Sequence, residues 1–295
     1  MPANKRLLLV HAHPDDESIG TGAIMAKYVA EGADVTLVTC TLGDEGEILI
    51  PELEHLAAHA EDKLAAHRLT ELADAMACLG VTDYRILGGI GAYRDSGMIG
   101  TQPNNRPDTF WQADLLEAAK HLVRIIREVK PQVVVTYDDF GGYGHPDHIQ
   151  AHRVTMYAVS LAATPSFDPS LGSAWQVAKL YWTAFPVSSI RQGIEALRAA
   201  GETTGFAAQD PDDIPFACPD EYITTIVDAT PYVEQKFAAL RAHATQISTE
   251  SGFFALSNNL GSQVMGFEHF RLALGQLGPV DESGHETDLF AGVVD

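Results

Sequence analysis

The sequence predicts an α/β fold, with a Rossmann-like and mostly parallel sheet flanked by helices. Two observations lead to this prediction. Short runs of β-branched and aliphatic residues alternate with longer helical patterns through the first half of the chain. Two of these runs, residues 7–10 and 133–135, are apolar throughout, which is typical of strands covered on both faces. Strands and helices that alternate in this way join into a parallel sheet through right-handed crossovers.

The elements of the first half follow from these runs. Its strands share short β-branched or aliphatic stretches and are expected at residues 6–13, 34–42, 84–87 and 132–138. Its helices share longer patterns with apolar residues at helical spacing and are expected at residues 17–31, 56–79, 113–129 and 146–161. His-Pro-Asp-Asp-Glu follows the first strand in place of Gly-x-Gly-x-x-Gly, so the dinucleotide-binding fingerprint of a Rossmann fold is missing.

The second half of the chain has a less regular pattern. Its elements are expected as strands at 177–184 and 222–227, helices at 189–200 and 231–245, and an Asp- and Pro-rich loop at 211–219. We therefore predict a Rossmann-like, metal-binding catalytic core over residues 1–165. A smaller C-terminal α/β portion over residues 166–295 is expected to extend the sheet, cover the active-site mouth and shape the substrate pocket.

The acidic composition limits the partners that the chain can bind. The 295 residues include 40 Asp and Glu against 19 Lys and Arg, which gives a formal net charge of −21. Such a chain repels nucleic acid and anionic membrane surfaces, because phosphate binding needs clustered Lys and Arg. No run approaches the roughly 18 apolar residues of a transmembrane helix. We expect a small-molecule substrate and no nucleic-acid or membrane partner, while the sequence leaves the oligomeric state unknown.

The N-terminus and the cysteines indicate the compartment. The apolar stretch at residues 7–10 is too short for the h-region of a signal peptide. The three cysteines, Cys40, Cys78 and Cys218, are isolated and odd in number. Buried thiols in a reducing compartment explain them better than a disulfide framework, so we expect a cytoplasmic protein.

Two segments hold nearly all the reactive side chains. Residues 13–17 follow the first strand, and residues 138–148, Asp-Asp-Phe-Gly-Gly-Tyr-Gly-His-Pro-Asp-His, follow the fourth. Ligand sites in open α/β sheets lie beyond the carboxyl ends of the strands, at the switch in strand order. In the common doubly wound order the first and fourth strands are neighbours. The two segments are therefore expected to face each other across one crevice.

The residue types in these segments predict a catalytic metal site. A catalytic zinc takes three imidazole or carboxylate ligands and keeps a fourth position for water. His13 and Asp16 can converge across a proline-fixed turn, and the second segment must supply the third ligand. Spacing leaves His148 and His145 as alternatives for that ligand. Asp15 and Asp16 both lie at a helix start, where the dipole stabilises ionised carboxylates, so that one can ligate the metal while the other stays available as a base.

The same residues resemble the signature of a known family. His-Pro-Asp-Asp-Glu at 13–17, with His-Pro-Asp-His at 145–148, is similar to the motif pair of the LmbE/PIG-L deacetylases. The resemblance implies an amide hydrolase with one Zn²⁺ per subunit, held by His13, Asp16 and His148. Zinc and ferrous iron both suit two imidazoles and a carboxylate, so Fe²⁺ stays an alternative.

The resemblance also implies roles for four further residues. Asp15 matches the general base, which takes a proton from the attacking water and returns it to the leaving amine. His145 matches the residue that stabilises the oxyanion or protonates the leaving group, and Asp147 matches the partner that orients it. Tyr143 matches a mobile tyrosine that supports the oxyanion, and the glycines on both sides leave its loop free to move.

Three residues match the positions that hold sugar hydroxyls in the family. They are Glu47, Arg68 and Asp95. Arg68 lies on an otherwise apolar helical stripe, where a guanidinium needs a polar partner. An internal ion pair is the alternative for Arg68, and a solvated loop carboxylate is the alternative for Glu47 and for Asp95.

Further stretches of the sequence narrow the substrate. They lie at residues 38–43, 94–98, 141–144, 243–246 and 256–260. They resemble an actinobacterial branch of the family, which deacetylates N-acetylglucosaminyl-inositol during mycothiol synthesis. The alternatives are a mycothiol S-conjugate amidase, which tends to carry Lys where this chain has Gly20, and a deacetylase of another N-acetylated sugar. A non-catalytic binding module predicts the loss of a ligand or of the base, and neither is lost here.

Overall fold

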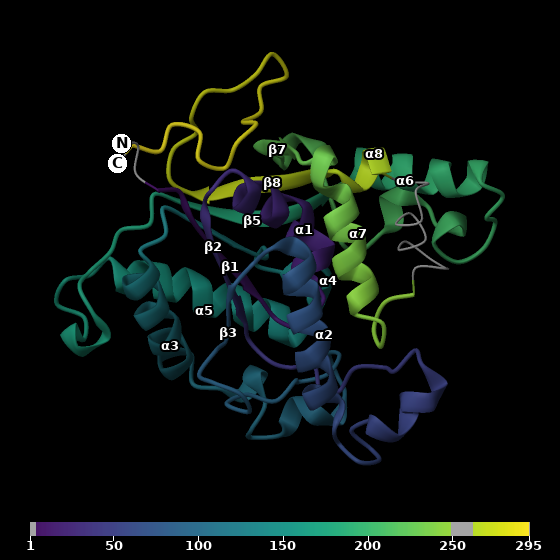
Figure 1. Cartoon of the computed structure of the whole chain (residues 1–295), viewed down its shortest axis with the longest axis horizontal. Coiled ribbons are helices and arrows are strands. Elements are labelled where there is room, and N and C mark those ends of the chain that lie inside the picture. Colours follow the sequence, from purple (N-terminus) through teal and green to yellow (C-terminus); the bar gives the residue numbers. More distant parts are fainter. Residues whose placement is uncertain (1–3, 249–261, 295) are drawn as a thin grey trace.

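The computed structural model describes residues 4–248 and 262–294 and contains both halves of the chain in one sheet (Figure 1). Eight strands are found in the described part: β1 Arg6–His11, β2 Asp34–Thr39, β3 Asp83–Ile86, β4 Val133–Thr136, β5 Lys179–Pro186, β6 Ala217–Cys218, β7 Thr225–Asp228 and β8 Phe267–Leu274. The α-helices described are α1 Asp16–Ala30, α2 Leu64–Leu79, α3 Leu115–Val129, α4 Gly141–Gly144, α5 Pro146–Ala162, α6 Val187–Ala199, α7 Val233–Ala242 and α8 Ser262–Met265. The motif stretch at 256–260 lies outside the described residues.

The strand order places β1 at the centre of the sheet. The order is β3-β2-β1-β4-β5-β8-β7, with β6 paired to β5. All neighbours from β3 to β5 are parallel, whereas β8 is antiparallel to both β5 and β7. The prediction of a Rossmann-like, mostly parallel sheet is confirmed, and so is the adjacency of the first and fourth strands. The division into two portions at residue 165 stays a prediction. Strands β5, β8 and β7 of the second half continue the sheet of the first half.

Continuous apolar runs form the central strands because both faces of the sheet are covered. Leu7 and Leu9 of β1 contribute to a core beneath α1, α2 and α7. Leu8 and Val10 alternate with them and contribute to a second core beneath α3 and α5. With a side-chain period of two, both faces bury apolar groups, and each of these four residues is 0% exposed.

Two helix boundaries differ from the expected ones by three residues or more, and tertiary contacts explain both. The helix expected from residue 56 begins at Leu64, since Asp62 has a positive φ of 54° and its carboxylate pairs with Arg94 at 2.7 and 3.0 Å. The helix expected to reach residue 245 ends at Ala242. Thr245 instead donates its main-chain N–H and its hydroxyl to the buried Glu71 carboxylate, at 2.8 and 2.7 Å.

Strand β8 was not expected, and a buried charge conceals it in the sequence. Glu268 interrupts the apolar alternation, yet its side chain is buried. It accepts from Lys236 Nζ at 2.7 Å and from the main-chain N–H groups of Ala23 and Ile24 at 3.0 and 2.8 Å. These three partners allow a carboxylate to occupy an inward-facing position of the strand. A sequence pattern for strands expects an apolar side chain at such a position, so β8 was not predicted.

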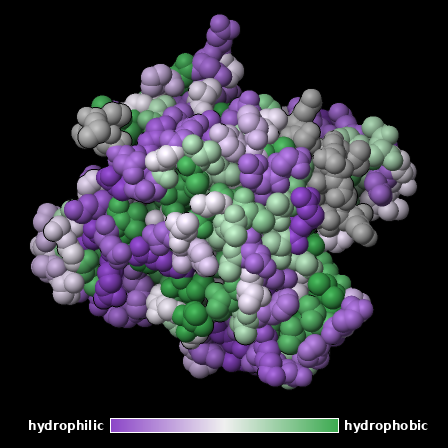
Figure 2. Space-filling view, in the orientation of Figure 1, coloured by the Kyte–Doolittle hydropathy of each residue, from purple (hydrophilic) through white to green (hydrophobic). Residues whose placement is uncertain are grey.

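The surface follows from the acidic composition. On the face drawn in Figure 2, hydrophilic residues are spread throughout, and hydrophobic residues gather in smaller areas among them. None of the helices in the described ranges is both long and apolar enough to cross a membrane. Segments near the two ends of the described chain meet, since Lys5 Nζ lies 2.8 Å from Asp288 Oδ2.

Candidate active site

The segment after β1 turns sharply so that its side chains lie beyond the strand end. Asp16 begins α1, and its Oδ2 accepts the main-chain N–H of His13 at 2.9 Å. Asp15 between them has a φ of 126°, although it is not a glycine. Such a conformation costs on the order of 1–3 kcal/mol and persists only where the surroundings impose it.

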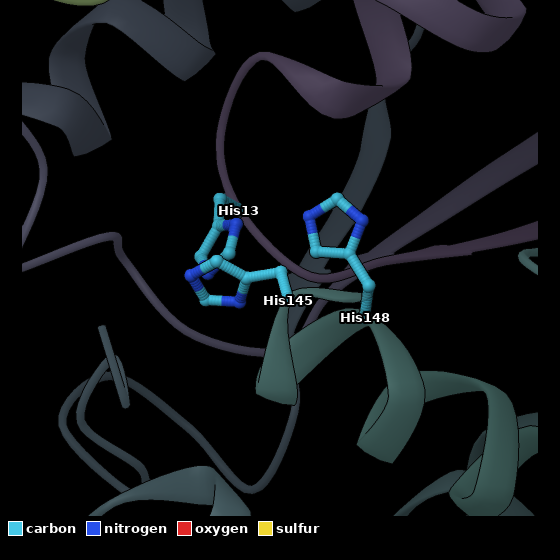
Figure 3. A group of neighbouring side chains, drawn as sticks. All are labelled: His13, His145 and His148. Carbon is cyan, nitrogen blue, oxygen red and sulfur yellow. The ribbon is translucent and has the colours of Figure 1, made fainter. Parts of the chain in front are cut away.

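The segment after β4 delivers two histidines on the first turn of α5 (Figure 3). Pro146 occupies the first helical position, where its missing N–H is not needed. His145 is the N-cap, and its Nδ1 accepts the main-chain N–H of Asp147 at 3.1 Å. His145 Nε2 therefore carries the ring proton in the neutral form. His148 follows within the same turn and is 3% exposed.

The two segments meet as predicted, around the carboxylate of Asp16. Its Oδ2 lies 3.4 Å from His13 Nδ1 and 3.3 Å from His148 Nε2. His148 Nε2 is buried and has no hydrogen-bond partner within the described ranges. A buried imidazole nitrogen without a partner, beside a carboxylate and a second imidazole, suits a divalent metal ion. The donor set of His13, Asp16 and His148 thus fits the expected metal.

His145 remains geometrically close to the same centre. One ring nitrogen each from His13, His145 and His148 lie within 4.8 Å of one another. The ring centroids of His13 and His145 are 4.7 Å apart, and those of His145 and His148 are 5.3 Å apart (Figure 3). The assignment of His148 rather than His145 as third ligand therefore stays a prediction.

The carboxylate of Asp147 contacts His13 and not His145, which corrects the expected pairing. Asp147 Oδ2 lies 3.2 Å from His13 Nε2 and accepts the main-chain N–H of Ser96 at 2.9 Å, while Oδ1 accepts the Ser96 hydroxyl. Only the main-chain N–H of Asp147 reaches His145. A carboxylate on the far nitrogen of a metal-ligating histidine fixes its tautomer and ring orientation. Asp147 is placed to do this for His13.

Asp95 lies inside the histidine cluster. It is 4% exposed, and its Oδ1 is 3.6 Å from His13 Nε2 and 4.0 Å from His145 Nε2. The alternative of a solvated loop carboxylate is therefore wrong for Asp95. Burial alone would lower the pKa of His13, but the carboxylates of Asp95, Asp147 and Asp16 raise it well above its ordinary value.

Arg68 holds the carboxylate expected to act as the base. It is 3% exposed, and its Nη2 lies 3.1 Å from Asp15 Oδ2. The same guanidinium donates to the carbonyl oxygens of Gly43, at 3.0 Å, and Pro14. Burial raises the pKa of Asp15 to about 6, although Arg68 opposes the shift. The internal ion pair considered for Arg68 is present, and its side chain also lines the cavity.

Two hydrogen-bond donors lie on the other side of the centre. Burial and the neighbouring His13 and His148 lower the pKa of His145 to about 3, which keeps its ring neutral with Nε2–H as donor. Burial also raises the pKa of Tyr143, which keeps its hydroxyl protonated. The Tyr143 ring lies 4.9 Å from the His148 ring and is 42% exposed, between glycines with positive φ.

Tyr137 contacts the site and was missed in the sequence. Its ring stacks on His148, with centroids 4.3 Å apart at 25°, and its hydroxyl accepts the Ala12 main-chain N–H at 2.8 Å. It therefore supports one expected ligand and the strand end that carries another. One signal in the sequence could have indicated Tyr137. It directly follows strand β4, as His13 closely follows β1, and site residues lie beyond the ends of these strands.

The site opens into a cavity of about 1020 Å³ that both halves of the chain line. The first half contributes the exposed Glu47 and most of the site residues described above: His13, Asp15, Asp16, Arg68, Asp95, Tyr137, Tyr143, His145 and His148. The second half contributes residues of varied type: Thr183, Ala184, Phe185, Phe206, Gln209, Pro215, Phe216, Ala217, Cys218, Pro219, Tyr222, Gln246 and Arg271. That the C-terminal portion shapes the substrate pocket stays a prediction, which these lining residues support.

Comparison with known proteins identifies the family. The sequence profile of GlcNAc-PI de-N-acetylase, PIG-L, matches residues 8–159. The chain belongs to the PIG-L family. The matched span contains both segments of the site, and the resemblance found in the sequence is confirmed.

Relatives in the PIG-L family cover this chain almost completely. The 1D-myo-inositol 2-acetamido-2-deoxy-alpha-D-glucopyranoside deacetylase of Geodermatophilus obscurus is 60% identical over 294 residues, which cover 99% of each chain. A deacetylase of the same name from Nocardioides sp. is 60% identical over 302 residues, covering 99% of this chain and 100% of the relative. At this identity and coverage, the fold and the family are shared over both halves.

Solved structures show the fold more widely. The N,N'-diacetylchitobiose deacetylase of Pyrococcus horikoshii has a TM-score of 0.61 and 21% identity, covering 92% of this chain and 84% of that one. The 4-carboxy-2-hydroxymuconate hydratase of Pseudomonas putida has a TM-score of 0.60 and 18% identity, covering 94% and 99%. One name is that of a deacetylase and the other that of a hydratase, so the fold alone does not define the reaction.

Proposed function

We propose that this chain hydrolyses the acetamide of 1D-myo-inositol 2-acetamido-2-deoxy-α-D-glucopyranoside to the free amine and acetate, in mycothiol biosynthesis. The observation that carries the proposal is the set of PIG-L relatives of this name, at 55–60% identity over nearly the full length. The buried His13, Asp16 and His148 supply a metal centre of the kind that amide hydrolysis uses. The cytoplasm, where the acetylated sugar-inositol would be available, is the expected compartment.

The metal is proposed to be one Zn²⁺ per subunit, with Fe²⁺ as the alternative. His13, Asp16 and His148 would hold it, with Asp147 fixing the His13 ring from the opposite nitrogen. Bound there, the ion would supply Lewis acidity toward the acetamide carbonyl and acidify the attacking water. The unpaired His148 Nε2 supports this ligand set, since a nitrogen that coordinates a cation needs no hydrogen-bond partner.

Asp15 is proposed to move the proton. Its carboxylate lines the cavity next to Asp16, and Arg68 holds one of its oxygens. A pKa raised to about 6 leaves the group largely ionised at neutral pH but basic enough to accept a proton from water. The same proton can then pass to the leaving nitrogen, so that the amine departs neutral and leaves acetic acid, which ionises to acetate by releasing its proton to solvent.

His145 and Tyr143 are proposed to stabilise the oxyanion. Because the Asp147 main-chain N–H occupies His145 Nδ1, the ring presents Nε2–H toward the cluster. Tyr143 can add its hydroxyl as a second donor from the glycine-rich α4. Donors aimed at the developing charge lower the barrier more than the same groups in water, because the site is buried.

Glu47 is proposed as the main contact to sugar hydroxyls. It is exposed and lines the cavity, and its side chain forms no hydrogen bond or ion pair with the residues that the structure describes. Arg68 and Asp95 also line the cavity, but Asp15 and His13 already engage them. If Arg68 and Asp95 also contact the substrate, they would do so in addition to their ion pairs with Asp15 and His13.

The test is acetate release from the N-acetylglucosaminyl-inositol by metal-stripped protein, with and without added Zn²⁺ or Fe²⁺. We expect no release without metal and restored release with one equivalent. The same preparation is assayed on a free N-acetylated sugar without the inositol. Equal turnover of both compounds would contradict the assigned substrate but keep the deacetylase reaction.

A second candidate is a mycothiol S-conjugate amidase with the same metal centre. The cavity favours it, because its wall includes Phe185, Phe206 and Phe216, an apolar region beyond what a sugar-inositol needs. Gly20, which lines the same cavity, favours the deacetylase. Comparing kcat/KM for the acetylated sugar-inositol and for a mycothiol thioether separates the two functions.

A further inference from the structure

The glutamate of the His-Pro-Asp-Asp-Glu motif has no place in the mechanism above. Glu17 is 0% exposed and does not line the cavity. Its Oε2 accepts the main-chain N–H of Asp15 at 3.0 Å, and its Oε1 accepts the Ser18 hydroxyl at 2.6 Å. Glu17 therefore contacts the main chain of Asp15 from beneath the site, without reaching the reacting groups.

The partner of Glu17 comes from the far end of the chain. His243 follows α7 and is 0% exposed, and its Nε2 lies 2.8 Å from Glu17 Oε1. The carbonyl of His243 accepts the main-chain N–H groups of Gln246 and Ile247 at 3.0 and 2.9 Å. The sequence alone assigned no role to the stretch 243–246. The contact with Glu17 connects this stretch to Asp15, the proposed base.

Asp15 needs such support because of its backbone conformation. A φ of 126° is rare for a residue with a side chain, and nothing in the order Pro14-Asp15-Asp16 imposes it locally. Two anchors act on Asp15 from different sides. Arg68 holds its carboxylate at 3.1 Å, and Glu17 holds its main-chain N–H.

We infer that Glu17 and His243 are a positioning pair, which keeps the Asp15 main chain in the conformation that turns its carboxylate toward the metal-binding side chains. Glu17 bonds the N–H directly, and His243 fixes the rotamer and orientation of Glu17. The inference rests on the proposed function, in which Asp15 is the base. Through this pair, the second half of the chain takes part in the reaction without a side chain at the reacting centre.

The first experiment compares His243→Phe and His243→Gln with Lys236→Met as the matched control. Lys236 lies on α7, the helix that His243 follows, and also forms a buried ion pair, but its partner is Glu268 and not Glu17. We expect His243→Phe to lower kcat on the order of 100-fold, as for a misplaced catalytic group, with KM and bound metal nearly unchanged. His243→Gln, whose amide can donate to Glu17, should recover most of that loss, and Lys236→Met should lower the melting temperature but not kcat.

A double-mutant cycle with Asp15→Asn separates positioning from general stability. If His243 acts through Asp15, His243→Phe should lower the residual rate of Asp15→Asn little further. Losses that multiply, or an unchanged kcat for folded His243→Phe, would overturn the inference. If His243→Phe does not fold, the cycle is made with Glu17→Gln, which leaves one acceptor oxygen for three buried donors, the Asp15 N–H, the Ser18 hydroxyl and His243 Nε2. Wild-type protein that releases no acetate contradicts the proposed function, whereas an active wild type with multiplicative losses contradicts only the positioning pair.

Discussion

The two loops that form the site are built in opposite ways. The β1 loop, residues 12–15, is held from beneath: Glu17 bonds the main chain of Asp15, and Arg68 bonds its carboxylate. The β4 loop, residues 137–145, contains three glycines with positive φ and exposes Phe140 and Tyr143 by 53% and 42%. The difference teaches that strain imposed by buried partners can position a fixed group, while glycine freedom leaves room for the movement proposed for Tyr143.

The largest effect is expected from removing His148, the proposed metal ligand on the first turn of α5, just after the β4 loop. His148→Ala should weaken metal binding by more than the roughly 10- to 100-fold typical of an outer-shell partner, and lose activity with it. Metal content after equilibrium dialysis measures this. His145→Ala is the comparison, and it should keep its metal. Metal loss in His145→Ala and retention in His148→Ala would make His145 the third ligand.

The next effect concerns Asp15, the proposed base on the β1 loop. Asp15→Ala should keep the metal and lower kcat by about 10²- to 10⁴-fold, the usual contribution of a general base. Asp139→Ala removes an exposed carboxylate from the β4 loop and serves as control, with kcat expected near wild type. Metal-free Asp15→Ala protein would show that Asp15 is a ligand and that the division of roles between Asp15 and Asp16 is wrong.

A smaller effect is expected at Tyr143, the second of the two proposed oxyanion donors. Tyr143→Phe should lower kcat on the order of 10-fold, less than the 10²- to 10³-fold typical of a rigid oxyanion donor, because Tyr143 is half exposed. Bound metal should not change. A kcat equal to wild type, measured by steady-state acetate release, would reduce Tyr143 to a loop residue with no part in the reaction.

The smallest effect on rate is expected from alanine substitutions at Gly141 and Gly142 of the β4 loop. These two variants should differ measurably in stability. Gly142→Ala meets no atom within 4 Å, so backbone strain alone should destabilise the fold by about 1–3 kcal/mol. A Cβ at Gly141 would lie 2.6 Å from His148 Cβ, so Gly141→Ala should add the effect of overpacking, about 1–3 kcal/mol more. Urea unfolding of both variants tests the order, and equal midpoints would contradict the close contact with His148.

The central sheet and the meeting of the two loops were predictable, because both depend on short-range signals. Continuous apolar runs define β1 and β4, and the doubly wound order then brings His13 and His148 together. The partners of the site were not predictable in the same way. Asp147 stands next to His148 in sequence, yet its carboxylate contacts His13, 134 residues away.

Long-range partners also explain what was missed outside the ligands. Nothing near Glu17 in sequence indicates His243, and nothing near Asp62 indicates that Arg94 ends the helical pattern. Strand β8 was concealed by Glu268, whose buried carboxylate takes its partners from two other elements. In each case a polar group is satisfied by a residue that only the folded chain brings near.

The cavity wall has a practical consequence for enzyme design. Each side chain proposed to bind metal, move a proton or donate to the oxyanion lies between His13 and His148. The lining from the second half of the chain comes from residues within 183–222, Gln246 and Arg271. Libraries that randomise Phe206, Phe216 and Tyr222 can therefore explore new acyl or aglycone preferences while metal loading and the bond-breaking machinery stay as they are.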